Sequence, residues 1–255
     1  MGVMCGRFAV TTDPALLAEK IKAIDEATGT DGASAPNYNV APTNMIATVV
    51  SRHSEPDDEV TRRVRLMRWG LVPSWVKAGP DGAPDTKGPL LINARADKVA
   101  TSPAFRNSAK SKRCLVPMDG WYEWRANEAG PGKKAAKTPF FMHRDDGGLV
   151  CMAGLWSVWK PAKDADPLLS CTIITTDAVG ELAAIHDRMP LLLGEENWDA
   201  WLNPDAPLDE ELLARPPDVH GIELRPVSTL VNSVRNNGPE LLAPAEPEPE
   251  QITLL

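Results

Sequence analysis

Proline and glycine limit what this chain can fold into more than any other feature of its sequence. The 255 residues include 24 Pro and 18 Gly, spread along the whole length, and each of them tends to interrupt a regular helix or strand. Many short elements joined by turns are therefore expected. The 43% of apolar residues suffices for a sizeable core in a chain of this length, while no apolar run is long enough to span a membrane.

The apolar pattern predicts which short elements form. Runs of β-branched or alternating apolar residues predict strands at 45–51, 60–69, 113–117, 139–143, 149–156 and 168–176. Apolar residues at helical spacing predict helices at 14–27, 178–185, 195–202 and 208–214, the first of them capped by Asp13 ahead of Pro14. Loops are predicted at 29–37, 77–88 and 126–137. Many strands with few helices favour an α+β fold: a single domain in which curved antiparallel β-sheets form a barrel-like core flanked by helices.

Charge and cysteine usage narrow the function classes. The 27 basic and 35 acidic residues give a net charge of −8, which argues against indiscriminate nucleic-acid binding. A local basic groove is compatible with this charge, because residues 86–113 carry seven basic residues and one acid, a local charge of +6. The four cysteines and four histidines show no metal-ligand spacing, so neither a metal nor an organic cofactor is expected. No secretory signal is recognisable, which predicts a cytoplasmic protein with reduced cysteines.

Four residues carry the candidate chemistry: Cys5, Asn93, Glu123 and His186. Each alone has a plain structural explanation, as a packed residue, a turn residue, a solvated edge position and a helix cap. Together they suggest more, because an amino-terminal cysteine offers an amine with a pKa of roughly 8 and a thiol with a pKa of about 8.5. Such an aminothiol condenses with an aldehyde, first to an imine and then to a five-membered thiazolidine. The proton transfers call for a nearby carboxylate and imidazole, which Glu123 and His186 supply.

Six motifs, in this order along the chain, resemble those of one protein family. They are MCGRFA at 4–9, YNVAPT at 38–43, RWGLVPSW at 68–75, LINARAD at 91–97, DGWYEW at 119–124 and IHDRMP at 185–190. They are similar to the successive motifs of the SOS response-associated peptidase (SRAP) family, whose members shield abasic sites by crosslinking to DNA through an amino-terminal cysteine. The resemblance extends to the VRNNGPEL segment at 234–241. It implies a SRAP-like domain over 5–242, a leader at 1–4 to be removed, and an acidic flexible tail over 243–255.

The resemblance also implies a role for each matched residue. Cys5 would be the crosslinking nucleophile, oriented by Asn93. Glu123 would act as general acid/base, and His186 would transfer a proton that opens the abasic sugar or releases water. The resemblance implies that seven residues hold the DNA strand, with the guanidinium groups on its phosphates. They are Arg7, Asn39, Pro42, Trp75, Arg95, Thr175 and Arg188.

The implied activity is DNA–protein crosslinking of a lyase type, together with a cysteine-type self-peptidase activity that frees Cys5. The implied partner is single-stranded DNA that contains abasic sites, including sites at junctions with duplex. The resemblance is compatible with a monomer that binds no membrane and that associates with the nucleoid through DNA.

Two positions depart from the family pattern. Val76 follows Trp75 where some relatives carry a second aromatic residue, which weakens a stacking platform for a strand that bends at a junction. Residues 1–4 precede Cys5, and a retained leader would acylate the amine. Either translation starts at Met4, or the protein removes its own leader.

Two other functions fit part of the pattern. An amino-terminal-nucleophile cysteine amidase would use the Cys5 thiol as nucleophile and its amine as base, with Asn93 in the oxyanion hole. A non-catalytic single-stranded DNA binder would use only charge and tryptophan. The amidase has no need of the basic segment at 86–113, and the binder leaves Glu123 and His186 without a purpose.

Overall fold

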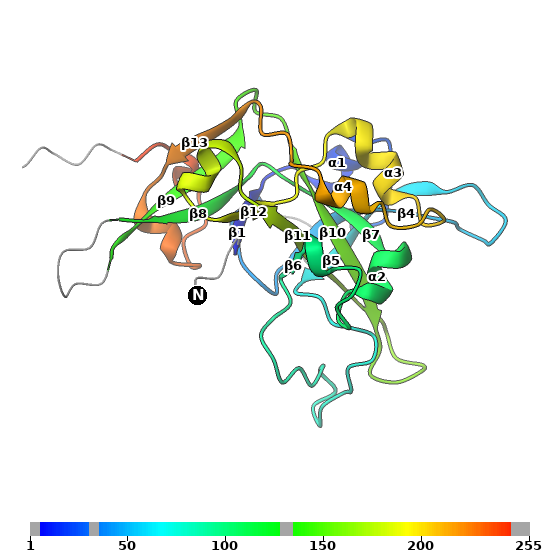
Figure 1. The fold of residues 1–255 in the computed structure, drawn as a ribbon. Helices are drawn as coiled ribbons and strands as arrows, with labels where there is room; N and C mark the ends of the chain where they lie inside the picture. Colours follow the sequence, from blue (N-terminus) through cyan, green and yellow to red (C-terminus); the bar gives the residue numbers. More distant parts are fainter. Residues whose placement is uncertain (1–5, 31–35, 128–134, 246–255) are drawn as a thin grey trace, which may run out of the picture.

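Two β-sheets dominate the fold (Figure 1). The structure is a computed structural model that describes residues 6–30, 36–127 and 135–245. Cys5, the predicted leader at 1–4 and residues 246–255 of the predicted tail lie outside the described residues. The chain forms a single, mostly β domain with a few helices, which confirms the predicted fold class. No helix in the described ranges is long and apolar enough to cross a membrane.

The smaller sheet has five antiparallel strands in the order β13-β9-β8-β1-β3. These are β13 (Ile222–Pro226), β9 (Lys137–Arg144), β8 (Gly120–Ala126), β1 (Arg7–Val10) and β3 (Asn37–Val40). The first strand of the chain is thus held inside this sheet, between β8 and β3. That placement fixes the position of Arg7, the first residue of β1.

The larger sheet has eight strands and closes on itself. Its order is β12 (Arg188–Pro190), β11 (Leu168–Asp177), β10 (Val150–Trp159), β7 (Arg113–Met118), β4 (Met45–Arg52), β5 (Thr61–Trp69) and β2 (Ile24–Asp25). β6 (Asn93–Arg95) adds to β11. β11 also pairs with β5, Ser170 beside Arg68 and Cys171 beside Trp69. The strands β11, β10, β7, β4 and β5 therefore form a ring, which confirms the predicted barrel-like core.

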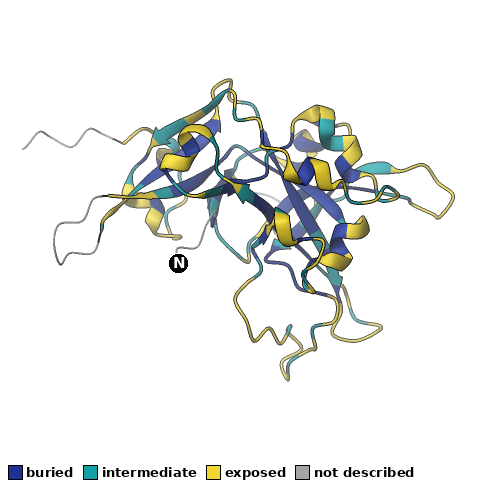
Figure 2. Cartoon of the chain, in the orientation of Figure 1, coloured by how far each residue is buried: buried dark blue, intermediate teal, exposed yellow. Residues whose placement is uncertain are grey.

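Short helices cover the outside of this ring, where Figure 2 shows buried strands beneath helices with exposed outer faces. They are α1 (Pro14–Lys20), α2 (Arg106–Ser111), α3 (Trp198–Leu202) and α4 (Glu210–Ala214). The 3-10 helices are Ala96–Lys98, Gly180–Ala184, Glu195–Asn197, Thr229–Asn232 and Pro239–Leu242. The apolar core has two main parts. One lies between the two sheets, and the other lies between the helices and the larger sheet.

The predicted helix at 14–27 is too long. It starts as predicted, because the Asp13 carboxylate accepts from the Ala15 N–H at 2.8 Å ahead of Pro14. It ends at Lys20, because Lys22 adopts the left-handed conformation with φ 54° and stops the helix. Ile24 then enters β2. The predicted helix at 178–185 is a 3-10 helix instead, and it begins at a left-handed Gly180 with φ 57°.

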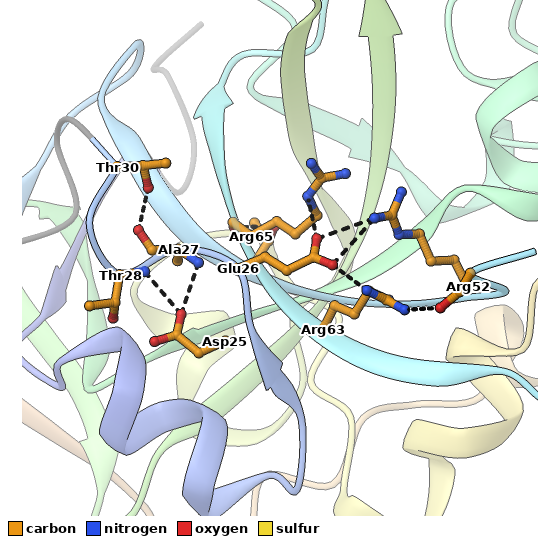
Figure 3. Close-up of polar contacts among 10 residues, drawn as sticks. Asp25, Glu26, Ala27, Thr28, Thr30, Arg52, Arg63 and Arg65 are labelled. Atoms are coloured by element: carbon orange, nitrogen blue, oxygen red, sulfur yellow. Dashed lines mark hydrogen bonds and ion pairs between the residues drawn. The ribbon is translucent and has the colours of Figure 1, made fainter.

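A single carboxylate gathers three arginines at one end of β4 and β5 (Figure 3). Glu26 lies 3.1 Å from Arg65 Nε and 3.3 Å from Arg52 Nη2, and it also pairs with Arg63. Arg63 is buried, with a side chain that is 10% exposed. Burial alone would raise the pKa of Glu26. The hydrogen bond from Arg63 and the charges of Arg52 and Arg65 outweigh that effect and lower the pKa below its ordinary value.

Replacing Glu26 with glutamine is expected to destabilise the fold by roughly 3 kcal/mol, because a buried guanidinium loses its counter-charge. A lowered pKa in the folded state stabilises the protein above the unfolded pKa of about 4.3, and this contribution disappears as the pH falls through the folded value. The difference from wild type in urea unfolding should therefore shrink below a pH of about 4. Glu59→Gln is the control, since Glu59 is exposed and has no ion pair within the described ranges. Equal unfolding midpoints for wild type and Glu26→Gln at neutral pH would contradict this account.

Candidate active site

The C-terminal half of β11 brings five of the predicted site residues together. β6 pairs with β11 so that Asn93 lies beside Ile173 and Arg95 beside Thr175. β12 pairs with the same stretch, Arg188 beside Asp177. His186 comes two residues before Arg188. Asn93, Arg95, Thr175, His186 and Arg188 therefore share one edge of the larger sheet.

Arg188 on β12 stabilises this edge of the larger sheet through contacts with β11. Its Nη2 donates to the Thr175 carbonyl at 2.6 Å, and its Nη1 pairs with the Asp177 carboxylate. The Arg188 side chain is 10% exposed, whereas that of Asp177 is 87% exposed. The buried Nε makes no hydrogen bond to any described residue. Arg188 is thus held in place with donor capacity to spare.

Arg95 is the exposed cation of the site. Its Nε and Nη2 bond to the Asp97 carboxylate at 2.9 and 3.1 Å. The hydrogen bond and charge of Asp97, with smaller contributions from Asp177 and Asp187, hold the pKa of Arg95 above its ordinary value. Exposed ion pairs of this kind contribute little to stability. A phosphate can therefore replace Asp97 as the partner of Arg95 at little cost.

His186 is oriented through Nδ1. The backbone N–H of Arg188 donates to Nδ1 at 3.1 Å, and the Asp187 carboxylate lies 2.8 Å from the same atom. Nδ1 makes one of these contacts at a time, because it accepts when it is bare and donates when it carries a hydrogen. Nε2 makes no contact with a described polar group, and the side chain is 25% exposed. This nitrogen can meet a substrate.

Glu123 lies on β8 of the smaller sheet. The residue is 3% exposed, so its carboxyl is buried and the plain structural alternative, a solvated edge position, does not apply. β1 pairs with β8 in antiparallel fashion, Arg7 beside Tyr122. Gly6, the residue before Arg7, therefore comes next to Glu123 in this register, and Gly6 is buried.

Trp69 brings these two groups of residues toward one another. Phe8 of β1 packs on its ring, with centroids 4.8 Å apart. The Trp69 indole N–H donates to the carbonyl of Ile92, the residue before Asn93, at 3.0 Å. The start of β1 and the start of β6 thus meet over one buried ring. This packing could not be inferred from the motifs alone.

Arg7 and Asn39 make contacts that the sequence did not indicate. Arg7 Nη1 donates to Asn39 Oδ1 at 2.7 Å and to the Val231 carbonyl at 2.9 Å. The Asn39 amide donates to backbone carbonyls of Val231, Ser233 and Asn236. Both residues therefore hold the C-terminal strap, residues 228–237, against β1 and β3. The signal for this segment is the VRNNGPEL motif, for which the sequence offered no role.

The strap has two further anchors beside the site. Trp124, next to Glu123, donates from its indole N–H to Asn232 Oδ1 at 2.7 Å. The Tyr38 N–H donates to Asn237 Oδ1 at 2.7 Å. Beyond the strap, the Ala245 N–H bonds to the Pro226 carbonyl at 2.8 Å. The first residues of the expected flexible tail at 243–255 are therefore attached to the end of β13.

The remaining predicted residues lie in the loops around this site. Pro42 sits in the turn between β3 and β4, next to Thr43, whose φ of 76° is unusual for a threonine. Trp75 is 62% exposed in the connection between β5 and β6. Of the basic segment at 86–113, Arg113 is buried and donates to backbone carbonyls of residues 109, 110, 201, 203 and 206. It serves packing and contributes nothing to a surface groove.

The described residues contain no group of three His, Cys, Asp or Glu side chains that could hold a metal ion. What they provide is a buried carboxyl, an oriented imidazole and an amide near the start of the chain, with arginines beside them. Such an arrangement suits proton transfer to a bound electrophile next to an anionic chain.

Comparisons with known proteins agree with this class of site. A family profile described as SOS response associated peptidase (SRAP) matches residues 4–234. The abasic site processing protein YoqW of Bacillus subtilis is 37% identical over 242 residues, which cover 94% of this chain and 99% of the relative. The abasic site processing protein HMCES of Gallus gallus is 36% identical, covering 85% of this chain and 68% of the relative.

A crystal structure of a protein from Bacteroides thetaiotaomicron has the same fold. It superposes with a TM-score of 0.75 at 25% identity and covers 95% of this chain and 100% of the other. The chain belongs to the SOS response-associated peptidase family.

Proposed function

We propose that this protein processes abasic sites by crosslinking to them through Cys5 in single-stranded DNA. The names of its relatives, abasic site processing proteins, support this function. The observation that carries the proposal is the pairing of β1 with β8, which brings Gly6 next to the buried Glu123. Cys5 is bonded to Gly6, and neighbouring Cα atoms are only about 3.8 Å apart. The proposal requires its amine and thiol to reach that carboxyl.

The reaction joins the aminothiol to the aldehyde of the abasic sugar. The Cys5 amine adds to the C1′ carbonyl and gives a carbinolamine, whose hydroxyl leaves as water to form an imine. The thiol then adds to the carbon of this protonated imine, its proton passes to Glu123, and a thiazolidine closes. The net change is the loss of one water. Glu123 donates the proton to the departing hydroxyl and receives one as the ring closes.

His186 and Asn93 assist at the two ends of this sequence. An abasic sugar is mostly a closed hemiacetal, and it exposes its aldehyde only when a proton moves from the hydroxyl to the ring oxygen. His186 Nε2 is the group assigned to that transfer. Asn93, on β6 beside β11, orients the Cys5 aminothiol by hydrogen bonding.

Arginines hold the flanking phosphates. Arg95 and Arg188 do so directly, and Thr175, which accepts from Arg188, borders the same channel. Arg7 and Asn39 line the path of the DNA strand and also hold the strap. Pro42 and Trp75 border the path of the DNA from the loops. Trp75 offers a stacking face for a strand that bends, as at a junction with duplex.

Arg95→Ala is expected to weaken DNA binding without destabilising the fold, because Arg95 is exposed and Asp97 is its one ion-pair partner among the described residues. Removing one phosphate-binding cation should make the slope of log affinity against log salt shallower by roughly 0.7 for a single strand. Arg144→Ala is a matched control, since Arg144 forms the same kind of exposed pair with Asp146, two residues on, at 2.9 Å. Fluorescence anisotropy over a series of salt concentrations measures both variants. Equal slopes for the two would remove Arg95 from the binding groove.

Intact mass after incubation with an oligonucleotide that contains one abasic site tests the function. The expected species is protein plus DNA minus one water, stable to heat, and absent with an intact strand. Glu123→Gln should slow its formation without changing DNA affinity, because only proton transfer is altered. Binding without any covalent mass would instead identify a non-catalytic single-strand binder and contradict the proposal.

A further inference from the structure

Three arginines and one carboxylate form a charged cluster away from the candidate active site (Figure 3). Glu26 pairs with Arg52, Arg63 and Arg65, and we refer to these four residues as the Glu26 cluster. Arg52 ends β4, and Glu26 directly follows β2. Arg63 and Arg65 lie two residues apart on β5 and therefore on the same face of that strand. None of the steps proposed for Cys5 uses these residues.

The Glu26 cluster lies far from the candidate active site along the strands of the larger sheet. β5 and β11 run in the same direction, with Ser170 beside Arg68. Arg65 comes three residues before Arg68, whereas Thr175 of the site comes five residues after Ser170. Because each strand residue advances the chain by about 3.3 Å, roughly 26 Å of strand separate Arg65 from Thr175. A small ligand at the cluster therefore does not touch the groups assigned to the reaction.

The cluster carries more positive charge than Glu26 can balance. Three guanidinium groups against one carboxylate leave an excess of two positive charges among these described residues. The Arg63 side chain is 10% exposed, and a buried charge is costly unless it is paired. Burial lowers the pKa of Arg65, and the neighbouring charge of Arg52 lowers it further. The fold thus holds like charges together with too little negative charge beside them.

The donors that Glu26 leaves unused lie on Arg52 and Arg65. Both bond Oε2 of Glu26, from Arg52 Nη2 at 3.3 Å and from Arg65 Nε at 3.1 Å, and Figure 3 draws both guanidinium groups above this carboxylate. Within the described ranges, neither Nη atom of Arg65 nor Nη1 of Arg52 has a partner. The buried Nε of Arg52 has none there either. The two Nη atoms of one guanidinium form a fork that fits two oxygens of an anion.

We propose that the Glu26 cluster binds one dianionic phosphate group, as inorganic phosphate or as the terminal group of a phosphate monoester. Such a group carries a charge of about −1.5 to −2 near pH 7, which matches the excess of two positive charges. Arg65 offers both Nη atoms as a fork and Arg52 adds Nη1, while Glu26 keeps its present bonds. A carboxylate or a phosphodiester brings a single charge and leaves part of the excess unbalanced. The site is independent of the proposed function, because it needs no DNA.

Nitrogen-15 NMR of the arginine Nε–H groups tests the proposal residue by residue. The Nε–H groups of Arg52 and Arg63 are buried, which slows their exchange with water, and Arg52→Lys and Arg63→Lys assign their signals. Sodium phosphate near neutral pH should shift the Arg52 signal to a plateau, whereas sodium chloride of equal ionic strength should not. A nucleoside monophosphate should give the same plateau, and an intact oligonucleotide without terminal phosphates should give none. A shift with the oligonucleotide alone, or no saturable shift with either monoester or inorganic phosphate, would overturn the proposal.

Removing the fork should weaken binding of phosphate. Arg65→Gln is expected to lower the affinity for inorganic phosphate, followed through the Arg52 signal, about tenfold or more, because charge-assisted hydrogen bonds are lost. The variant should fold, since it removes one of the excess charges and leaves Arg63 paired with Glu26. Arg106→Gln is the control, because Arg106 is exposed on α2, outside the cluster. Equal phosphate affinities for the two variants would contradict the assignment of Arg65.

Rescue of Glu26→Gln gives an independent measurement. In this variant a bound phosphate can replace the missing carboxylate as the counter-charge of the arginines. Phosphate should therefore raise the urea unfolding midpoint of Glu26→Gln more than that of wild type or of Glu59→Gln, whose exposed residue lies outside the cluster. Comparison with these two proteins removes the general stabilising effect of phosphate on folded proteins. Equal rises in all three proteins would show that the cluster takes no phosphate.

Discussion

Cys5→Ala is expected to reduce the heat-stable DNA adduct to background. Without the thiol, the reaction stops at an imine, and an imine hydrolyses when the sample is heated. DNA binding should change little, because the phosphate contacts belong to other residues. Denaturing gels after heating and intact mass give the measurement. An alanine variant that yields the wild-type adduct in the same amount would contradict the aminothiol mechanism.

The other cysteines provide an internal control for this experiment. Cys114, Cys151 and Cys171 are buried. Burial raises the pKa of the Cys151 thiol to about 12 and raises those of Cys114 and Cys171 as well. A short treatment with iodoacetamide at mildly alkaline pH should therefore modify Cys5 alone, since the thiolate is the reactive form. The treated wild type should lose crosslinking to the same extent as Cys5→Ala, and one label per chain should account for the loss.

The strands of the ring could be predicted from the sequence, while the short strands at the site could not. Strands at 45–51, 60–69, 113–117, 149–156 and 168–176 were evident from β-branched apolar runs, and the structure confirms all of them as β4, β5, β7, β10 and β11. β6 and β12 have three residues each. Such short segments have no periodicity, and their pairing with β11 is set by residues distant in sequence.

The residue types of the site were evident from the motifs, but their partners were not. Arg7 and Asn39 bond to backbone carbonyls of the strap. A carbonyl is present at every residue, so no side-chain pattern announces such a contact. Likewise, the charge of Arg113 suggests a basic groove, whereas its guanidinium is buried among carbonyls. Net charge along a segment does not tell which side chains reach solvent.

The acids beside the arginines affect how DNA can bind at this edge. Asp97, Asp177 and Asp187 are exposed where Arg95 and Arg188 lie. They balance the cations while no DNA is bound, which suits a chain with a net charge of −8. A phosphate must compete with these carboxylates, so binding depends on a few well-placed contacts. For the proposed function, this balance predicts weak binding to intact DNA and retention through the covalent bond.

The second large effect concerns residues 1–4. An imine needs a free amine, so any residue left before Cys5 should block the thiazolidine completely, however well the DNA binds. A chain that starts at Met4 should lose its methionine readily, because the cysteine side chain that follows is small, and should crosslink. A chain that starts at Met1 should crosslink only to the extent that residues 1–4 are removed.

Self-removal of the leader would hydrolyse the bond between Met4 and Cys5. The Cys5 thiol attacks the Met4 carbonyl, the acyl group moves from nitrogen to sulfur, and water then releases the leader as a free acid. Cys5→Ala should therefore keep its leader under conditions in which wild type loses it. Amino-terminal sequencing of both proteins, each expressed from Met1, distinguishes this route from processing by the host, which would trim the two alike. Complete crosslinking by a chain that still begins at Met1 would rule out the amine as nucleophile, because its nitrogen would then be an amide with no lone pair available for the aldehyde.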